Sequence, residues 1–425
     1  MPRAVTTSQE LPDAPSQTSD RTKVFLTAAA QALRLVLAAT TGAILARTLQ
    51  PDGRGVYAVI TTIATTAIII GHLSVPHSQI AFWGDRLVNR ALTANGLILG
   101  LVSGAVAGIC TVALTPLILP YEALLLAAAV LVAAPLGVAA CNLQRVLLLE
   151  AQVATSNHGI LLSALVQCVP TAVLAATGNV TIATVIVIWC AATVLPLGLY
   201  VWKLRPAVAH ADRGLALRQL NLSYRYHIGL ISLHLLMTID VLLLNAMTSP
   251  AEVGIYTVAV SVLSLANVPA DAILQVVLPR QAAQDMTNSR SATVRALRWT
   301  IPSSLACVGM LAAASPVVVP LMYGDAYEGS IAALMVLAPG IAALSMVRLM
   351  EQYLIRLQRP LSMAGLCMGA LAVNVALNLM WIPRWGAVGA ALSSTVAYGL
   401  LALAQFIRFA RALPSSTDSP LEDRI

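Results

Sequence analysis

The chain alternates between long apolar runs and short polar segments over most of its 425 residues. Each run is roughly 20 residues long, the length an α-helix needs to cross a bilayer, and none alternates like a barrel strand. Because backbone groups in lipid must bond within their own segment, the runs predict an all-α integral membrane protein with about twelve transmembrane helices. The predicted spans cover about residues 24–46, 56–81, 91–115, 122–143, 158–177, 180–202, 227–247, 254–278, 300–322, 330–352, 361–382 and 387–407.

One turn between apolar runs occurs twice, as LARTLQPDGRGVY at 45–57 and LNAMTSPAEVGIY at 244–256. In both copies a Pro is followed four residues later by Gly and six later by Tyr. A duplicated membrane protein explains this echo. The matched pairs are Pro51 and Pro250, Gly55 and Gly254, and Tyr57 and Tyr256, at a constant offset of 199. We expect Pro51 and Gly55 to shape the turn and Tyr57 to anchor it at the membrane interface.

The longest internal polar segment, 203–226, divides the spans into six and six. Since six is even, the two halves are predicted to be parallel repeats. Both ends of the chain are polar and rich in Pro and Ser, which is typical of disorder. We therefore predict a disordered tail, a six-helix lobe, a basic linker, a second six-helix lobe and a second tail. Their bounds are 1–23, 24–202, 203–226, 227–411 and 412–425.

Composition and charge placement agree with a membrane location. The chain is 58% hydrophobic and only 10% charged, against about 25% charged in soluble domains. The net charge of +7 comes from loops on one side, where 20 of the 25 Lys and Arg residues lie, against three on the other side. This asymmetry predicts that both termini are cytoplasmic, and it favours membrane lipids over nucleic acid as the surface that the charges face.

Motifs for enzyme chemistry are missing from the sequence. It has no Walker motif, Gly-rich nucleotide loop or Ser/His/Asp arrangement, and every predicted external loop is short. The six cysteines fall inside apolar runs without CxxC or metal spacing, so we expect inert thiols and no metal centre. These features argue against an enzyme and against a bound cofactor.

Two motifs resemble a known group. LARTLQPDGRGVYAV at 45–59, and WIPRWGAVGAA at 381–391 preceded by Asn374 and Asn378, resemble polysaccharide (O-antigen-type) flippases of the multidrug/oligosaccharidyl-lipid/polysaccharide (MOP) superfamily. The resemblance implies two six-helix lobes around a V-shaped central cavity, which rock between inward-open and outward-open states. It also implies a glycan cargo on a polyprenyl pyrophosphate.

Arg34 is a candidate cargo contact. It lies about 15 Å into the first span at 1.5 Å per residue, near the membrane midplane. A charge at that depth requires a partner. A guanidinium fork matches the oxygens of a pyrophosphate, so Arg34 could bind the anionic carrier. The alternative is a structural ion pair with an acidic residue such as Asp240.

Asp240, in the seventh span, is the candidate coupling residue. Resemblance to the lipid II flippase group implies a cation site built from this span and polar residues of the last two spans. Asn374 and Asn378 share a helix face, and Ser394 or Thr395 could complete an oxygen cage. Since one carboxylate supplies the only formal charge, Na⁺ and H⁺ are both candidate ions, and pairing with Arg34 is the alternative.

The repeat offset also relates His72 to Asp271. Both are predicted at equivalent places in the two lobes, near the cytoplasmic mouth of the cavity, where His72 could change charge near neutral pH. The alternative is that both are hydrogen-bonded polar residues that join helices.

The leading hypothesis is a flippase for a lipid-linked glycan precursor, acting as a monomer near glycosyltransferases or a polymerase in a bacterial cytoplasmic membrane. A multidrug antiporter of the same superfamily is the first alternative, although only four Phe are present to line a drug cavity. A membrane glycan polymerase or ligase is the second. It would need a large external catalytic loop.

Overall fold

The computed structural model describes residues 17–118, 123–268, 270, 273, 286–356 and 360–411. Every regular element in these ranges is a helix, and nine of these helices are long and apolar enough to cross a membrane. The prediction of an all-α integral membrane protein is confirmed. The helices are α1 (Gln17–His72), α2 (Val75–Phe82), α3 (Arg86–Ile118), α4 (Ala123–Leu149), α5 (Val153–Ala176), α6 (Ile182–Leu204), α7 (Arg213–Met247), α8 (Pro250–Ser264), α10 (Met286–Tyr323), α11 (Gly329–Arg356) and α12 (Pro360–Arg411), with short 3-10 helices η2 (Val208–His210) and η3 (Asp325–Tyr327).

Two of the long helices each join two predicted spans. α12 contains both of its spans, whereas the span predicted at 56–81 runs past the end of α1 and is broken at Leu73 and Ser74, before α2. In α1, Gln50 has a non-helical φ of 56° and ψ of 175°, and the runs at 24–46 and 56–81 lie on either side of it. In α12, Gly386 has φ 51° and ψ −128° and separates the last two predicted runs. The connections between these pairs of spans are therefore breaks at single residues.

Two helices begin earlier than hydropathy predicts. The segment 203–226 is predicted to be a linker, but its second half belongs to α7, which starts after Asp212. The Asp212 side chain caps this helix by accepting a backbone N–H bond from its first turn at 3.0 Å. α1 likewise begins at Gln17, inside the predicted tail 1–23. Hydropathy detects only the apolar part of a helix and so misses polar first turns. The rest of that tail, and residues 412–425, lie outside the described residues.

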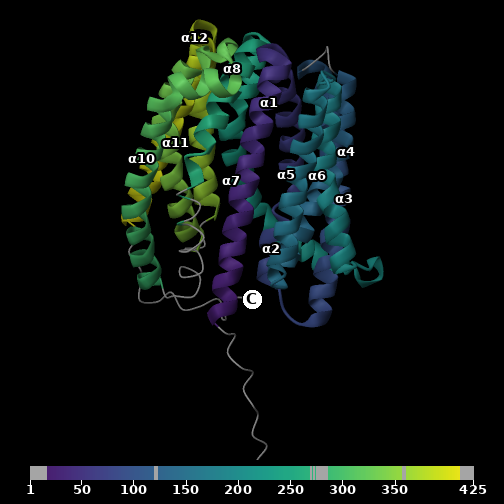
Figure 1. The fold of residues 1–425 in the computed structure, drawn as a ribbon. Helices are drawn as coiled ribbons and strands as arrows, with labels where there is room; N and C mark the ends of the chain where they lie inside the picture. Colours follow the sequence, from purple (N-terminus) through teal and green to yellow (C-terminus); the bar gives the residue numbers. More distant parts are fainter. Residues whose placement is uncertain are drawn as a thin grey trace, which may run out of the picture.

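The helices of the two halves of the chain stand on opposite sides of the molecule, with α1 and α7 between them (Figure 1). α1 packs against α3, α4 and α5 of its own half and against α8 of the other half, and α7 packs against α12. We refer to α1–α6 as the N-terminal lobe and to α7–α12 as the C-terminal lobe. The end where residues 205–212 connect the lobes is termed the linker end, and the opposite end is termed the turn end.

At the turn end the two copies of the repeated turn contact each other. Gly55 lies against the carbonyl oxygen of Pro250, and Gly254 lies against the carbonyl oxygen of Pro51. A methyl group on either glycine would overlap the oxygen that faces it. Because the repeat pairs these residues, the contact is reciprocal. The glycines of the motif therefore allow two helices to approach closely. The sequence pattern predicts only a role in turn geometry for them.

Side chains add further bonds between the lobes at the turn end. Arg47 Nε donates to the carbonyl of Met322 at 3.0 Å, and Nη2 donates to the carbonyl of Leu321. These carbonyls belong to the last turn of α10, where acceptors have no partner within the helix and a cation is favoured. The Tyr327 hydroxyl donates to the carbonyl of Ala46 at 3.0 Å. The lobes are thus joined at this end mainly through backbone atoms.

Candidate functional site

A buried carboxylate, that of Asp240, lies where α7, α8 and α12 meet. Its Oδ1 accepts a hydrogen bond from Asn378 Nδ2 at 2.7 Å. Its Oδ2 accepts from the Tyr256 hydroxyl at 2.7 Å and from the Ser394 hydroxyl. All four side chains are buried, and Asp240 is 0% exposed. These residues, together with Asn374, are termed the carboxylate cluster.

Helix periodicity explains how α12 supplies two amides to the cluster. Asn374 and Asn378 are four residues apart, so they share one helix face. Asn378 Nδ2 also donates to Asn374 Oδ1 at 3.0 Å, and Asn374 Nδ2 donates to Ser394 Oγ at 3.3 Å. The structure therefore brings together Asp240 and the three α12 residues that the sequence grouped with it. Thr395, the alternative to Ser394, bonds to a carbonyl of α11 instead.

Tyr256 is the member of the cluster that sequence reasoning missed. Its repeat partner, Tyr57, was expected at the membrane interface, but both tyrosines are buried, at 2% and 7% exposed. The Tyr57 hydroxyl accepts a bond from Gln167 Nε2 at 3.1 Å. The repeated turn thus directs one tyrosine hydroxyl into each lobe. The sequence repeat could have pointed to Tyr256, because it marks position 256 as equivalent to position 57.

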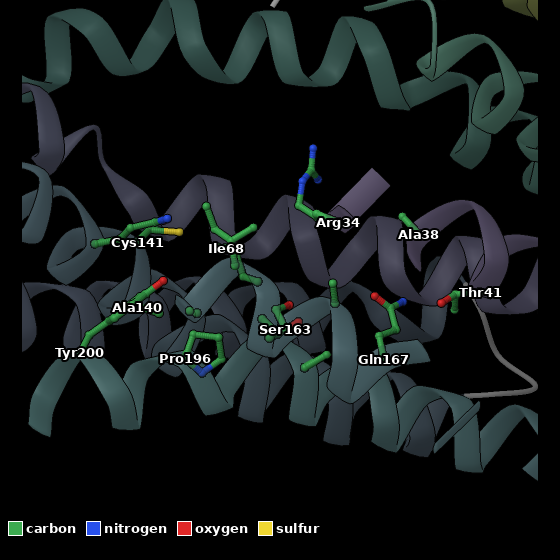
Figure 2. A pocket seen from close by; sticks show the side chains of 17 residues that line it. Arg34, Ala38, Thr41, Ile68, Ala140, Cys141, Ser163, Gln167, Pro196 and Tyr200 are labelled. Carbon is green, nitrogen blue, oxygen red and sulfur yellow. The ribbon is translucent and has the colours of Figure 1, made fainter. Parts of the chain in front are cut away.

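Arg34 lies in the other lobe, on α1. Its side chain is exposed, and its Nε donates to Gln31 Oε1 at 3.1 Å. No carboxylate among the described residues pairs with Arg34, and Asp240 is bonded inside the C-terminal lobe. The alternative pairing of Arg34 with Asp240 is therefore not formed. Figure 2 shows the guanidinium extending away from the other labelled side chains.

A cavity of about 360 Å³ lies beside Arg34, between α1, α4, α5 and α6 (Figure 2). Two glutamines in its lining use their amide N–H groups for internal bonds. Gln144 Nε2 donates to Ser156 Oγ at 3.1 Å, and Gln167 Nε2 donates to the Tyr57 hydroxyl at 3.1 Å. The amide oxygens are left as acceptors, and Ser163 adds a hydroxyl to the lining. The cavity lining is thus largely apolar, with a few uncharged polar groups and the Arg34 cation at its edge.

His72, the other predicted cavity residue that the structure describes, does not join this group. His72 is the last residue of α1 and does not line the cavity beside Arg34. Its Nδ1 is buried and has no hydrogen-bond partner among the described residues. Asp271 lies outside the described residues, so the proposed equivalence of the two positions stays a prediction.

No family model matches the sequence, and no curated protein matches it. Solved structures do match. Lipid II flippase MurJ in an inward closed conformation aligns with a TM-score of 0.72 at 12% identity, covering 92% of this chain and 88% of that chain. An inward-facing MATE multidrug resistance transporter of the MOP superfamily aligns with a TM-score of 0.67 at 14% identity, covering 89% and 94%. A MOP superfamily transporter from Pyrococcus furiosus gives 0.62 at 16%, covering 92% and 93%.

The chain has the MOP transporter fold. The resemblance found in the sequence is thus confirmed for the fold. At identities of 12–16% this likeness is one of fold alone. Within this MOP fold, Arg34 and Asp240 lie on the first helix of their respective lobes, α1 and α7.

The carboxylate cluster of this MOP-fold chain suits a proton or a small hard cation. Its donor set consists of one carboxylate, two amides and hydroxyl groups. Among the described residues, no three His, Cys, Asp or Glu gather as a metal site. The buried Oδ1 of Asn378 has no hydrogen-bond partner there, which leaves an acceptor available beside the carboxylate. Oxygen ligands with a single negative charge match a monovalent ion better than a transition metal.

Proposed function

We propose that this protein is a flippase that moves a polyprenyl-pyrophosphate-linked oligosaccharide or glycan precursor across the cytoplasmic membrane by alternating access. The observation that carries the proposal is the state of Arg34, an exposed guanidinium on a membrane-spanning helix without a carboxylate partner among the described residues. A charge in a membrane segment is costly unless it pairs or faces a water-filled space. A pyrophosphate would provide the missing anion and match the guanidinium fork.

The cavity beside Arg34 supports a sugar-bearing cargo. The acceptor oxygens of Gln144 and Gln167 and the hydroxyl of Ser163 suit the hydroxyl groups of a glycan. The lining contains no Asp or Glu, and Tyr200 is its one aromatic side chain. A site for cationic or amphipathic drugs would call for acidic or aromatic walls.

Asp240 is proposed to couple transport to H⁺ or Na⁺. Its carboxylate holds α7, α8 and α12 together through three hydrogen bonds, so neutralising it changes contacts among all three helices. Asp240→Asn should remove the dependence of transport on an imposed ion gradient. Asp325→Asn, an exposed carboxylate at the turn end, is the matched control. Unchanged gradient dependence in Asp240→Asn would reject this role.

The linker end and both termini are proposed to be cytoplasmic, in a bacterial inner membrane, because the excess of Lys and Arg lies on that side. A membrane-impermeant thiol reagent applied to intact cells should label Arg384→Cys and not Arg218→Cys. Both positions are exposed, Arg384 near the Gly386 break and Arg218 in the first turns of α7. The reverse labelling pattern would invert the orientation.

Reconstitution in liposomes tests the proposed function. The purified protein should accelerate translocation of a fluorescent polyprenyl-pyrophosphate oligosaccharide over empty vesicles. Arg34→Ala should abolish the acceleration with normal membrane insertion, whereas Arg384→Ala, at an exposed arginine, should retain it. Full activity of Arg34→Ala would contradict the role given to this residue.

A multidrug antiporter is the second candidate, because a MATE transporter shares the fold with a TM-score of 0.67. The same vesicles separate the two functions. Saturable efflux of a cationic dye without glycan translocation would favour the antiporter. Glycan translocation without dye efflux would favour the flippase.

A further inference from the structure

Four of the six histidines of the chain gather at one contact between the lobes. His72 and His77 lie at the linker end of the N-terminal lobe, and His227 and His234 lie on α7 opposite them. The other two histidines are exposed elsewhere. Residues His72, Ser74, His77, Ser223, Tyr226 and His227 are termed the histidine seam.

The seam is built on a break in the backbone of the N-terminal lobe. Leu73 and Ser74, between α1 and α2, have φ values of 46° and 55°. Two consecutive non-glycine residues in the left-handed region are strained, and such a conformation persists only when its surroundings hold it. Here the surroundings are α3 and α4 of the same lobe and α7 of the other, against all of which α2 packs. The contact with α7 is therefore one of the supports of the break.

Each seam contact joins a side chain of α7 to the break or to α2. Ser223 Oγ donates to the Ser74 carbonyl at 3.2 Å, and the Ser74 hydroxyl lies 3.4 Å from His227 Nδ1. The rings of His77 and Tyr226 stack with centroids 5.4 Å apart and an angle of 6° between their planes. Further along α7, the Thr66 hydroxyl lies 3.0 Å from His234 Nε2. Imidazole rings thus provide most of the side-chain contacts between α1–α2 and α7.

The charged or ionisable groups that act on His72 and His77 are cations or imidazoles. The electrostatic neighbours of His72 are His77, His227 and Arg145 of α4, and Arg145 also faces His77. Cys141 of α4 lies beside Arg145 and is a free thiol. No carboxylate of the described residues is among these neighbours. The imidazoles of His72, His77 and His227 are half-buried. Protonating one would place a second cation beside Arg145, which partial burial and like charge both oppose.

We propose that the histidine seam is a proton-sensitive latch that holds α7 to the N-terminal lobe and releases it on acidification. The latched form binds fewer protons than the separated form, in which the rings are hydrated. Separation is therefore favoured as pH falls, by about tenfold per pH unit for each proton taken up. The proposal of a latch is separate from the proposal of a glycan cargo and does not depend on it. It lies on the helix that carries Asp240, so its release would move one wall of the carboxylate cluster.

Distance measurements by electron paramagnetic resonance test the latch. Spin labels would be placed at Glu150→Cys in the N-terminal lobe and Leu217→Cys on α7, both exposed, after replacement of the six native cysteines. In lipid nanodiscs, lowering the pH from about 8 to about 5.5 spans the ordinary titration range of histidine. This change should increase the population with a longer distance between the labels.

Histidine variants test whether the pH response of the label distance arises from the seam. Combined replacement of His72, His77, His227 and His234 by Gln should remove the pH response, and each single replacement should reduce its steepness. His158→Gln, at an exposed histidine outside the seam, should respond like the parent protein. A parent with no response to pH would overturn the proposal. So would seam variants that respond fully, or an Asp240→Asn variant that loses the response while the seam is intact.

Discussion

The two ends of the interface between the lobes use different chemistry. At the turn end, Gly55 and Gly254 contact carbonyl oxygens across the repeat, and the additional bonds from Arg47 and Tyr327 also end on carbonyls. At the linker end, the contacts come from imidazole, hydroxyl and amide side chains. For example, Asn95 Nδ2 donates to the Asp212 carbonyl at 3.0 Å and to Gln219 Oε1 at 3.3 Å.

This difference indicates which end of the interface between the lobes can respond to pH. Burial raises the pKa of Tyr327 to about 12, so its hydroxyl stays protonated and its bond to Ala46 is insensitive to pH in the physiological range. Glycines and carbonyls do not titrate either. The turn end therefore depends on shape, whereas the linker end depends on groups that can gain charge. The alternating access that we propose needs both ends to separate in turn.

The largest effect is expected at the reciprocal glycines. Gly254→Ala places a methyl group on the Pro51 carbonyl oxygen, and such overpacking costs about 1–3 kcal/mol. Opening of the turn end should therefore rise by roughly 5- to 150-fold. Spin labels at the exposed positions Thr48→Cys and Glu328→Cys, one in each lobe, would report the opening.

A matched glycine variant separates this contact from helix propensity. Alanine favours a helix over glycine by about 1 kcal/mol, so propensity alone would stabilise α8. Gly309→Ala lies on α10 with open space around the added methyl group, and it should leave the distance distribution unchanged. Equal behaviour of Gly254→Ala and Gly309→Ala would refute the close-contact explanation.

A smaller effect at the same end is expected for Arg47→Gln. Arg47 donates two charge-assisted bonds to the last turn of α10, and hydrogen bonds to charged groups contribute about 1.5–3 kcal/mol in favourable settings. Because Arg47 is exposed, we expect the loss of interaction free energy to lie near the lower value of this range. Opening of the turn end should then increase roughly tenfold. The same label pair measures it, and the effect should weaken at high salt. An effect of Arg47→Gln that does not depend on salt concentration would indicate a loss of packing instead.

At the linker end, Tyr226→Leu should loosen the seam without removing a titratable imidazole. Aromatic stacking contributes about 0.5–1.5 kcal/mol beyond buried area, so separation of α7 should rise by roughly 2- to 12-fold at neutral pH. The slope of separation against pH should stay that of the parent, because the three seam histidines remain. Loss of the slope in this variant would mean that the stack, and not protonation, controls the latch.

The smallest effect is expected for Tyr327→Phe, which removes one hydroxyl bond to the Ala46 carbonyl. A neutral hydrogen bond contributes about 0.5–1.5 kcal/mol net, which corresponds to roughly 2- to 12-fold, and we expect opening of the turn end to rise near the lower value, equally at pH 6 and pH 8. A pH-dependent difference between this variant and the parent would contradict the assignment of pH sensitivity to the linker end.

The fold and part of the carboxylate cluster could be predicted from the sequence. Apolar runs of span length predict helices directly, and the four-residue spacing of Asn374 and Asn378 places them on one face. Grouping them with Asp240 and Ser394 came from the resemblance, since α7 and the two halves of α12 are distant in sequence. Tyr256 was missed because a tyrosine near a span end is usually an interfacial anchor.

The contacts between the lobes could not be predicted. The seam joins residues about 150 positions apart, and no local period links Ser74 to Ser223 or His227. The same holds for the contact of Gly55 with Pro250, although the repeat had marked both positions. The start of α7 was missed because its first turns are polar, and hydropathy does not detect a helix that lies outside the apolar span.

Binding of the carrier lipid tests the central claim most directly. The dissociation constant of a polyprenyl pyrophosphate would be measured for the purified protein and for Arg34→Gln, with the exposed Arg384→Gln as control. Loss of the charge-assisted guanidinium fork should weaken binding at least about tenfold in Arg34→Gln, which corresponds to about 1.4 kcal/mol. The affinity of Arg34→Lys should lie between those of the parent and Arg34→Gln. Arg384→Gln should bind like the parent. Equal affinities for the parent and Arg34→Gln would contradict the account.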